Sequence, residues 1–329
     1  MAAAGAGGSV PAMRHGLRWR GWLGGAAVLV CQVAWGAVWA QDTRPGEVVR
    51  VDRTSPFGRV RVSDYGATGL RCLEFPPGRV LQSCMRIDDP TRLVLPYTQA
   101  FAATLAVPGE VKRLLMIGLG GGSLVRWLQR YRPELAQHVV DIDPVVVEVA
   151  GEWFGVRAGP GLQIITMDGR ERLARDPARY DLIWLDAFGP EDAPYALTTV
   201  EFFQLVRSRL APGGAVAANI WAPGVNRSYH AQVRAVQEAF PETYELSEPA
   251  PDEPAVGLGG GLAVLADGSR IVVGSLAPRL AGAQWAERLA TWQAKQPLDC
   301  DLAALVRRKF HLLTDRPSST SPPHDLPAR

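Results

Sequence analysis

Glycine and aspartate residues recur in this chain where short apolar runs end. The first such run, residues 113–117, opens into a loop that carries Gly118, Gly120, Gly121 and Gly122. Glycines permit positive φ angles and let backbone N–H groups approach a ligand with no Cβ in the way. An apolar strand, a glycine turn and a helix are typical of the nucleotide-cradling start of a doubly wound α/β domain.

An aspartate ends or closely follows each of the next three apolar runs. Asp141 stands 23 residues past the first glycine, a distance at which a carboxylate can accept hydrogen bonds from both hydroxyls of a ribose. Asp168, followed by Gly169, can accept one from an adenine amino group, and Asp186 then faces the reactive end of the ligand. Since ligands of open α/β sheets bind outside the carboxyl ends of the strands, we expect these side chains to share one site. The alternative for Asp141, Asp143 and Asp168 is that each caps the helix after it.

Other chemistries have less support in the sequence. The third glycine of the dinucleotide fingerprint is replaced by Ser123, and no lysine or histidine stands at a strand end to assist hydride transfer, which argues against NAD. Neither a ligand pair with metal-site spacing nor a Gly-x-Ser-x-Gly elbow is present. Without Arg14, Arg18 and Arg20 the formal net charge falls from +2 to −1, and a near-neutral body argues against nucleic acid as the partner.

The elements that must position these residues alternate regularly. Residues 41–94 read as a small N-terminal antiparallel β unit, and residues 95–312 as a Rossmann-like, doubly wound domain with a mostly parallel sheet. A Pro/Ser-rich tail over residues 313–329 is predicted to be disordered. The predicted strands of the large domain are residues 113–117, 138–143, 162–166, 180–186, 215–221, 261–265 and 271–273. The spacing of Thr198 and Glu201 predicts a capping box at the start of a helix.

The first 40 residues are predicted to be a targeting segment and not part of the fold. A basic stretch, an apolar stretch and the small-residue site Val38-Trp39-Ala40 predict a signal peptide that is cleaved before Gln41, with export to the periplasm. The apolar stretch is long for a signal peptide, so anchoring in the inner membrane through residues 14–40 is the alternative.

Export would make disulfide bonds available to the cysteines of the mature chain. Three cysteines remain once Cys31 is set aside with the leader: Cys72, Cys84 and Cys300. Cys72 and Cys84 flank a Pro-Gly turn almost symmetrically, so they could face each other across a hairpin. Three buried thiols are the alternative, because an odd number of cysteines pairs badly.

As a set, these motifs resemble the spermidine synthases, the polyamine aminopropyltransferases. The likeness is carried by Ile-Gly-Leu-Gly-Gly-Gly at residues 117–122, Val-Asp-Ile-Asp-Pro at 140–144, Asp168-Gly169, and Tyr-Asp-x-Ile-x-x-Asp-Ala-Phe at 180–188. It covers about residues 48–245 and is similar in particular to a bacterial spermidine synthase-like branch with Gly-Leu-Gly-Gly-Gly-Ser in the loop. The resemblance implies a β unit joined to a class I methyltransferase-like Rossmann domain.

The resemblance also implies a transferase of polyamine biosynthesis that moves an aminopropyl group to a small-molecule amine. Decarboxylated S-adenosylmethionine, or S-adenosylmethionine itself, would be a co-substrate and not a permanently bound cofactor. Asp186 would act as the base, and Tyr97 would orient the acceptor. The nucleoside site would comprise Gly118, Gly120, Gly121, Gly122, Asp141, Asp168 and Gly169.

At two positions the chain departs from the family pattern, and these departures leave other functions open. The family carries aspartates at the positions of Gly121 and Gly189, and only Glu191 and Asp192, just beyond, are near enough in sequence to substitute. One alternative is therefore an S-adenosylmethionine-dependent small-molecule methyltransferase. Another is a catalytically degenerate adenosyl-nucleoside-binding protein, which export favours because the donor is a cytoplasmic metabolite. Assembly as a homodimer is left open by the sequence.

Overall fold

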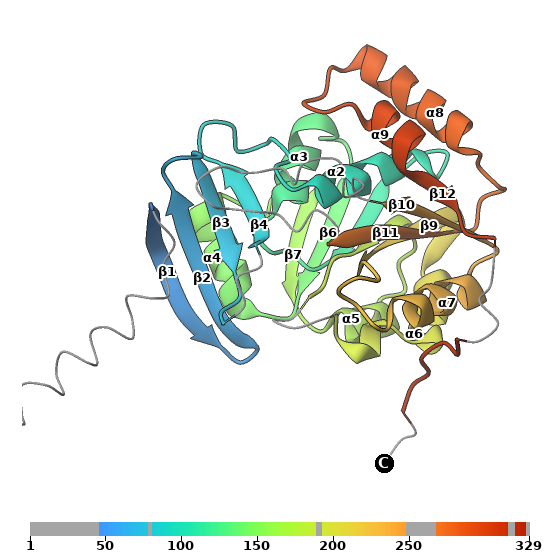
Figure 1. Ribbon diagram of the computed structural model, residues 1–329, viewed down its shortest axis with the longest axis horizontal. Helices are drawn as coiled ribbons and strands as arrows, with labels where there is room; N and C mark the ends of the chain where they lie inside the picture. The colour runs from blue at the N-terminus through green and yellow to red at the C-terminus, as the bar shows by residue number, and fades with distance from the viewer. Residues whose placement is uncertain (1–45, 78–80, 189–192, 248–267, 315–319, 327–329) are drawn as a thin grey trace, which may run out of the picture. The chain divides into compact units, whose positions relative to one another are not determined.

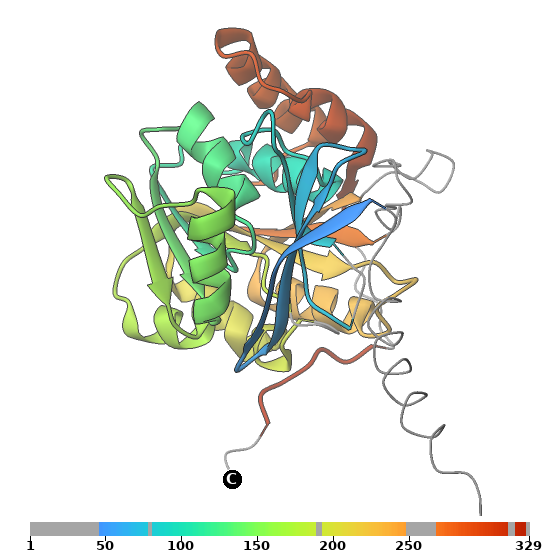
Figure 2. The same cartoon turned by 90° about the vertical axis from the view of Figure 1, so that its left-hand side faces the viewer.

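An antiparallel sheet of four strands forms the N-terminal part of the fold (Figure 1). The computed structural model describes residues 46–77, 81–188, 193–247, 268–314 and 320–326, all within a unit that runs from Arg44 to Arg329. The strands of this β unit lie in sequence order and are β1 (Glu47–Ser55), β2 (Gly58–Tyr65), β3 (Leu70–Glu74) and β4 (Leu81–Arg86). In Figure 2 they face the viewer.

The two cysteines of the β unit are joined. Cys72 and Cys84 are directly opposed across β3 and β4, and their sulfur atoms form a disulfide bond. Of the two alternatives that the sequence left open, the bridged pair is therefore the one observed, and Cys300 is a free cysteine. Both bridged side chains are almost fully buried, and they pack together with Tyr65, Leu70 and Leu95.

The larger sheet has eight strands in the order β12-β10-β11-β9-β8-β5-β6-β7. Its parallel part consists of β5 (Arg113–Ile117), β6 (Ala136–Asp141), β7 (Leu162–Thr166), β8 (Tyr180–Leu185) and β9 (Leu210–Trp221). Antiparallel pairing adds β10 (Glu242–Ser247), β11 (Ser269–Ser275) and β12 (Phe310–Leu312). The chain reverses its direction of winding between β5 and β8, which is where a doubly wound sheet opens a crevice for ligands.

Helices cover both faces of this sheet (Figure 1). One face packs against α2 (Pro96–Ala103), α3 (Ser123–Tyr131), α4 (Pro144–Phe154), α8 (Gly282–Lys295) and α9 (Leu302–Lys309). The other packs against α5 (Gly169–Arg175), α6 (Val200–Ser208) and α7 (Tyr229–Ala239). Two short 3-10 helices are η1 (Thr104–Ala106) and η2 (Tyr195–Leu197). The predicted class, a Rossmann-like α/β domain with a small antiparallel β unit, is confirmed.

Some predicted elements differ in detail from the structure. Helix α6 is capped by Thr199, whose hydroxyl accepts from the N–H of Phe202. The N-cap therefore lies one residue after Thr198, and the capping box predicted for Thr198 and Glu201 is wrong. Phe310 follows α9 directly and begins β12. The strand predicted over residues 261–265 lies outside the described residues.

The described part of the C-terminal tail differs from the predicted disorder. The backbone of Asp325 donates to Glu201, and its carboxylate forms a two-bond ion pair with Arg170. The carbonyl of Pro323 accepts from the N–H of Val200, in the first turn of α6. Residues 320–326 are held against α5 and α6 because their polar groups complete hydrogen bonds that composition alone does not reveal.

The predicted targeting segment, residues 1–40, lies outside the described residues. Among the helices that the structure does describe, none has both the length and the apolar character required to cross a bilayer.

Candidate active site

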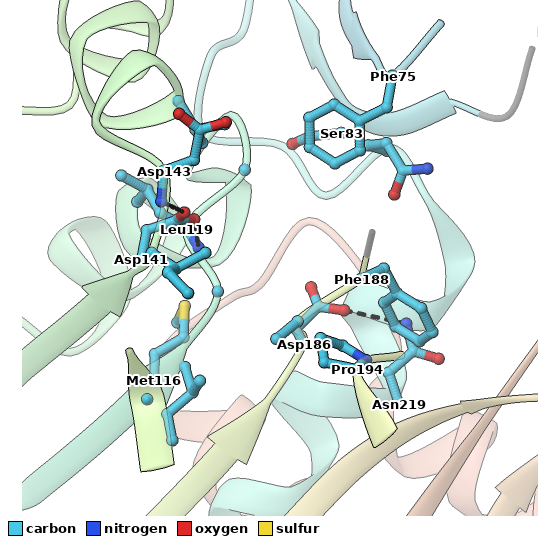
Figure 3. A pocket seen from close by; sticks show the side chains of 18 of the residues that line it. Phe75, Ser83, Met116, Leu119, Asp141, Asp143, Asp186, Phe188, Pro194 and Asn219 are labelled. Carbon is cyan, nitrogen blue, oxygen red and sulfur yellow. Dashed lines mark hydrogen bonds between the residues drawn. The ribbon is translucent and has the colours of Figure 1, made fainter. Parts of the chain in front are cut away.

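A cavity of about 730 Å³ lies beyond the carboxyl ends of β5, β6 and β8 (Figure 3). Seven of the residues predicted for the site line it: Tyr97, Gly118, Gly120, Asp141, Asp168, Gly169 and Asp186. The β unit supplies another part of the wall, including Arg59, Phe75, Gln82 and Ser83. The cavity is therefore enclosed between the β unit and the crevice of the large sheet.

Asp141, the last residue of β6, binds the glycine loop. Its Oδ2 accepts from the N–H of Leu119 at 2.8 Å and its Oδ1 from the N–H of Asp143 at 2.9 Å. Burial raises the pKa of Asp141, and these two backbone N–H groups act against the shift. Each carboxylate oxygen retains a lone pair, so ribose hydroxyls can add to these contacts.

The neighbouring aspartates do cap helices, as the alternative from the sequence proposed. Asp143 accepts from the N–H of Val145 at the start of α4 and also from the hydroxyl of Ser55. Asp168 accepts from the N–H of Glu171 at the start of α5. Both nevertheless line the cavity, so capping and ligand binding are compatible at these positions.

The glycines of the loop have different surroundings. Gly118 has φ of +100°, and a Cβ there would lie 2.1 Å from the backbone oxygen of Asp186, so no larger residue lets the loop pass so close. Gly121 and Gly122 do not line the cavity. A Cβ on Gly121 would meet Ser83 Oγ at 2.9 Å and the ring of Phe154 at 3.0 Å. An aspartate at Gly121 would therefore require Ser83 and Phe154 to move.

Asp186 follows β8 and stands on the other side of the glycine loop from Asp141 (Figure 3). Its Oδ1 accepts from Nδ2 of Asn219 at 3.0 Å. The hydroxyl of Tyr97 lies between two acceptors, the carboxylate of Asp186 and the carbonyl oxygen of Gln82, which is 3.1 Å away. Burial raises the pKa of Asp186 to about 6, and the hydrogen bonds from Asn219 and Tyr97 limit the rise. A carboxyl group poised in this way can accept a proton near neutral pH.

Beyond Asp186 the cavity wall becomes aromatic. The rings of Phe188 and Trp221 are stacked, with centroids 5.3 Å apart and planes 9° apart. Val225, half exposed, also lines the cavity.

Sequence reasoning missed several of these residues. Asn219 was detectable as the one polar side chain in the predicted strand of residues 215–221, which is otherwise apolar. Ser83 and Phe75 carried no signal, because only the packing of the β unit against the large sheet brings them to the cavity.

Comparisons with known proteins agree with this architecture. Residues 100–252 match the model of the spermine/spermidine synthase domain. A polyamine aminopropyltransferase from Chromobacterium violaceum is 36% identical over 164 residues, which are 50% of this chain and 62% of that protein. The chain therefore spans less than two thirds of the length of this curated relative.

Solved structures show the same fold. A probable spermidine synthase from Corynebacterium glutamicum superposes with a TM-score of 0.63 at 20% identity, over 84% of this chain and 97% of that chain. Human methyltransferase-like protein 13 in complex with SAH gives a TM-score of 0.50 at 25% identity, over 63% of this chain and 96% of that one. The resemblance noted from the sequence motifs is confirmed.

Proposed function

Because residues 100–252 match the model of the spermine/spermidine synthase domain, we propose that the protein transfers an aminopropyl group from decarboxylated S-adenosylmethionine to an amine. The observation that carries the proposal is that Asp141, Asp168 and Asp186 line one cavity at the switch point of the sheet. In this proposal two of these carboxylates bind the nucleoside and the third meets the reacting group.

The donor would lie across the ends of the parallel strands. Its adenine would meet Asp168 and Gly169 after β7, and its ribose would meet Asp141 at the end of β6. Strand β5 separates β6 from β8, so Asp141 and Asp186 stand roughly 10 Å apart across the sheet. This separation leaves room for the sulfonium and its propyl chain between the ribose and Asp186.

The chemistry requires placement more than covalent help. The acceptor nitrogen forms a bond to the carbon beside the sulfonium, the carbon–sulfur bond breaks, and its electron pair stays on sulfur to give methylthioadenosine. In-line placement of the two reactants can supply about 7–11 kcal/mol of the barrier. The proton that the amine must lose passes to the carboxylate of Asp186, while the Tyr97 hydroxyl orients the acceptor.

The state of Asp186 suits this role. Burial raises its pKa to about 6, and the positive charge of a bound sulfonium lowers it again. The carboxylate is then ionised near neutral pH and accepts a proton from an incoming ammonium. A positioned base of this kind contributes about 10²–10⁴-fold to the rate.

A second candidate is methyl transfer from S-adenosylmethionine to a small molecule. It is favoured by Gly121, because the loop offers no carboxylate for the amine of a decarboxylated donor and Phe154 closes that position. The likeness to human methyltransferase-like protein 13 is in keeping with it. The remaining alternative is a catalytically degenerate protein that binds the nucleoside without turning it over. For the location of the mature chain we propose the periplasm.

Calorimetry and turnover together distinguish the three readings. The full chain is titrated with decarboxylated S-adenosylmethionine, S-adenosylmethionine and methylthioadenosine, and product release is then measured with amines present. Preference for the decarboxylated donor with release of methylthioadenosine supports aminopropyl transfer. Preference for the intact donor supports methyl transfer, and binding without turnover supports the degenerate reading. If the protein binds none of the three ligands, the proposed nucleoside site is wrong.

A further inference from the structure

We propose that Arg170 and Asp325 are positioning residues of the nucleoside site, with Asp325 acting from the C-terminal tail through Arg170 on the wall of the cavity. Both are described residues, and neither lines the cavity itself. The inference deepens the function proposed above, because it rests on nucleoside binding in this cavity and names residues that set the affinity.

One part of the cavity wall is the short segment that carries η2. Pro194, Ala196 and Leu197 line the cavity. Within the segment, the N–H of Leu197 donates to the carbonyl of Pro194 at 2.8 Å, which closes the turn. None of the three residues of η2 is fully buried, so packing alone fixes the segment weakly. Its hydrogen bonds to other elements therefore matter for where the wall stands.

Arg170 ties this wall to the edge of the large sheet. It lies in the first turn of α5, directly after Asp168 and Gly169, which line the cavity on the proposed adenine side. Its Nη1 donates to the carbonyl of Ala196 at 2.8 Å. Gly169 is packed closely on β5, since a Cβ there would lie 2.3 Å from Cγ2 of Ile117. The start of α5 is thus a fixed point from which the guanidinium reaches the wall.

The tail, seen in red below α6 in Figure 1, holds the guanidinium in this direction. Both carboxylate oxygens of Asp325 accept from Arg170, and Oδ1 does so at 2.8 Å. The same Oδ1 accepts from the hydroxyl of Thr199, the buried N-cap of α6, at 2.7 Å. The hydrogen bond from Arg170 holds the pKa of Asp325 below its usual value, so the pair is ionised at neutral pH. A two-bond pair fixes the plane of the guanidinium and with it the bond to Ala196.

The tail also contacts η2 directly. The hydroxyl of Tyr195 donates to the carbonyl of His324 at 2.8 Å. The side chain of His324 and the N–H of Asp325 both bond to the carboxylate of Glu201, in the first turn of α6, at 2.8 and 2.9 Å. The tail, η2 and the first turns of α5 and α6 therefore form one hydrogen-bonded unit behind the wall.

Docking of the tail and binding of the nucleoside should consequently favour one another. When the tail is docked, the wall stands in one position. When the tail is released, the wall occupies that position for only a fraction of the time, and the apparent affinity falls by that fraction. By linkage, a ligand that fits the positioned wall strengthens docking of the tail by the same factor. A tail that only stabilised α6 would show neither effect.

The first test is the affinity of full-chain variants for methylthioadenosine, measured by calorimetry. Asp325→Asn keeps the shape of the side chain and removes its charge, so the affinity should fall about threefold to tenfold while Tm changes little. Asp325→Glu, which keeps a carboxylate, should retain most of the affinity. The matched control is Asp88→Asn, because Asp88 forms an exposed two-bond pair with Arg86 and does not line the cavity. Equal affinities of Asp325→Asn and the wild-type protein would overturn the inference.

The second test reads the coupling from the side of the tail. Hydrogen exchange is measured at the amides of Asp325 and Val200, whose N–H groups bond to Glu201 and to the carbonyl of Pro323. In the wild-type protein, saturating methylthioadenosine should slow exchange at both amides by about the same threefold to tenfold factor. Exchange that does not respond to the ligand would contradict the coupling, even if Asp325→Asn binds weakly.

A turnover measurement separates this inference from the proposed reaction. In Asp325→Asn the KM for decarboxylated S-adenosylmethionine should rise while kcat stays within about twofold, because the tail acts on the wall and not on the reacting atoms. A fall in kcat with unchanged KM and affinity would contradict positioning of the nucleoside. Wild-type protein that binds methylthioadenosine, shows the coupling and releases no product with any amine would contradict aminopropyl transfer and support the coupling.

Discussion

Replacing Asp186 by asparagine keeps the shape of the side chain and removes its ability to take a proton. The asparagine oxygen can still accept from Asn219, which donates to Asp186 at 3.0 Å, so the local hydrogen bonding is largely preserved. If Asp186 is the base, the variant should bind methylthioadenosine normally and lose at least about a hundredfold in kcat.

The stability of the protein depends on pH at this site, and the direction of the dependence follows from the pKa of Asp186. Burial raises the pKa of Asp186 from 3.8 to about 6, so the folded state disfavours the charged carboxylate. A pKa shift of about two units corresponds to roughly 3 kcal/mol of folding stability. The wild-type protein has this contribution below pH 4 and has lost it above pH 6. Stability should therefore fall as pH rises between about 4 and 6, and Asp186→Asn should remove this component.

Three measurements on the same preparation decide the matter. Thermal unfolding is recorded at pH 5 and pH 8, calorimetry gives the affinity for methylthioadenosine, and its release in the presence of an amine gives kcat. The reasoning is refuted if Asp186→Asn loses a few kcal/mol of stability at pH 8 but keeps normal activity per folded molecule. Asp186 would then be a structural residue, and this result would support the hypothesis of a catalytically degenerate nucleoside-binding protein.

Four further perturbations test other parts of the structure. Asp141→Ala should weaken every adenosyl ligand by a similar 1.5–3 kcal/mol, roughly the value of lost charge-assisted hydrogen bonds, and unchanged affinities in calorimetry would contradict the ribose assignment. Replacing Cys72 and Cys84 together by alanine should lower the free energy of unfolding by about 3 kcal/mol, measured by denaturant titration, because the bridge, with a sequence separation of 12, restricts the unfolded chain; equal stability of the two proteins would show that the bridge contributes nothing. Mass spectrometry of the native protein should find an N-terminus at or near Gln41, and an intact leader on soluble cytosolic protein would argue against export. Asp325→Asn should release the tail from α6 and increase its cleavage in limited proteolysis with little change in Tm, since exposed ion pairs contribute only about 0–1 kcal/mol; an unaltered cleavage rate would mean that other contacts hold the tail.

The periodicity of the chain was sufficient for the architecture of the large domain. Strands β5 and β8 are short, mostly apolar runs buried on both faces, and Pro144 with Asp143 begins α4 as a local signal. Because parallel strands must end at a common edge, the placement of Asp141, Asp168 and Asp186 beside one cavity could be predicted as well. The strand and helix predictions succeeded because each depends on residues that are neighbours in sequence, and the common edge follows from the parallel order of the strands.

What the sequence could not determine depends on contacts between distant segments. Whether Cys72 and Cys84 pair is decided by the register of β3 against β4, which places them opposite one another. The lining of the cavity by Ser83 and Phe75 depends on how the β unit packs against the large sheet, and the pairing of β8 with β9 brings Asn219 to Asp186.

The same limit applies to the tail and to the glycine loop. Composition predicted disorder for residues 313–329, yet Asp325 pairs with Arg170, a residue 155 positions earlier in the chain. The loop glycines look equivalent in sequence, but Gly118 lines the cavity and Gly121 packs against Ser83 and Phe154. Local pattern thus determined which residues stand at the strand ends, and only tertiary packing decided which of them meet, because side chains distant in sequence become neighbours only when the sheets and helices pack.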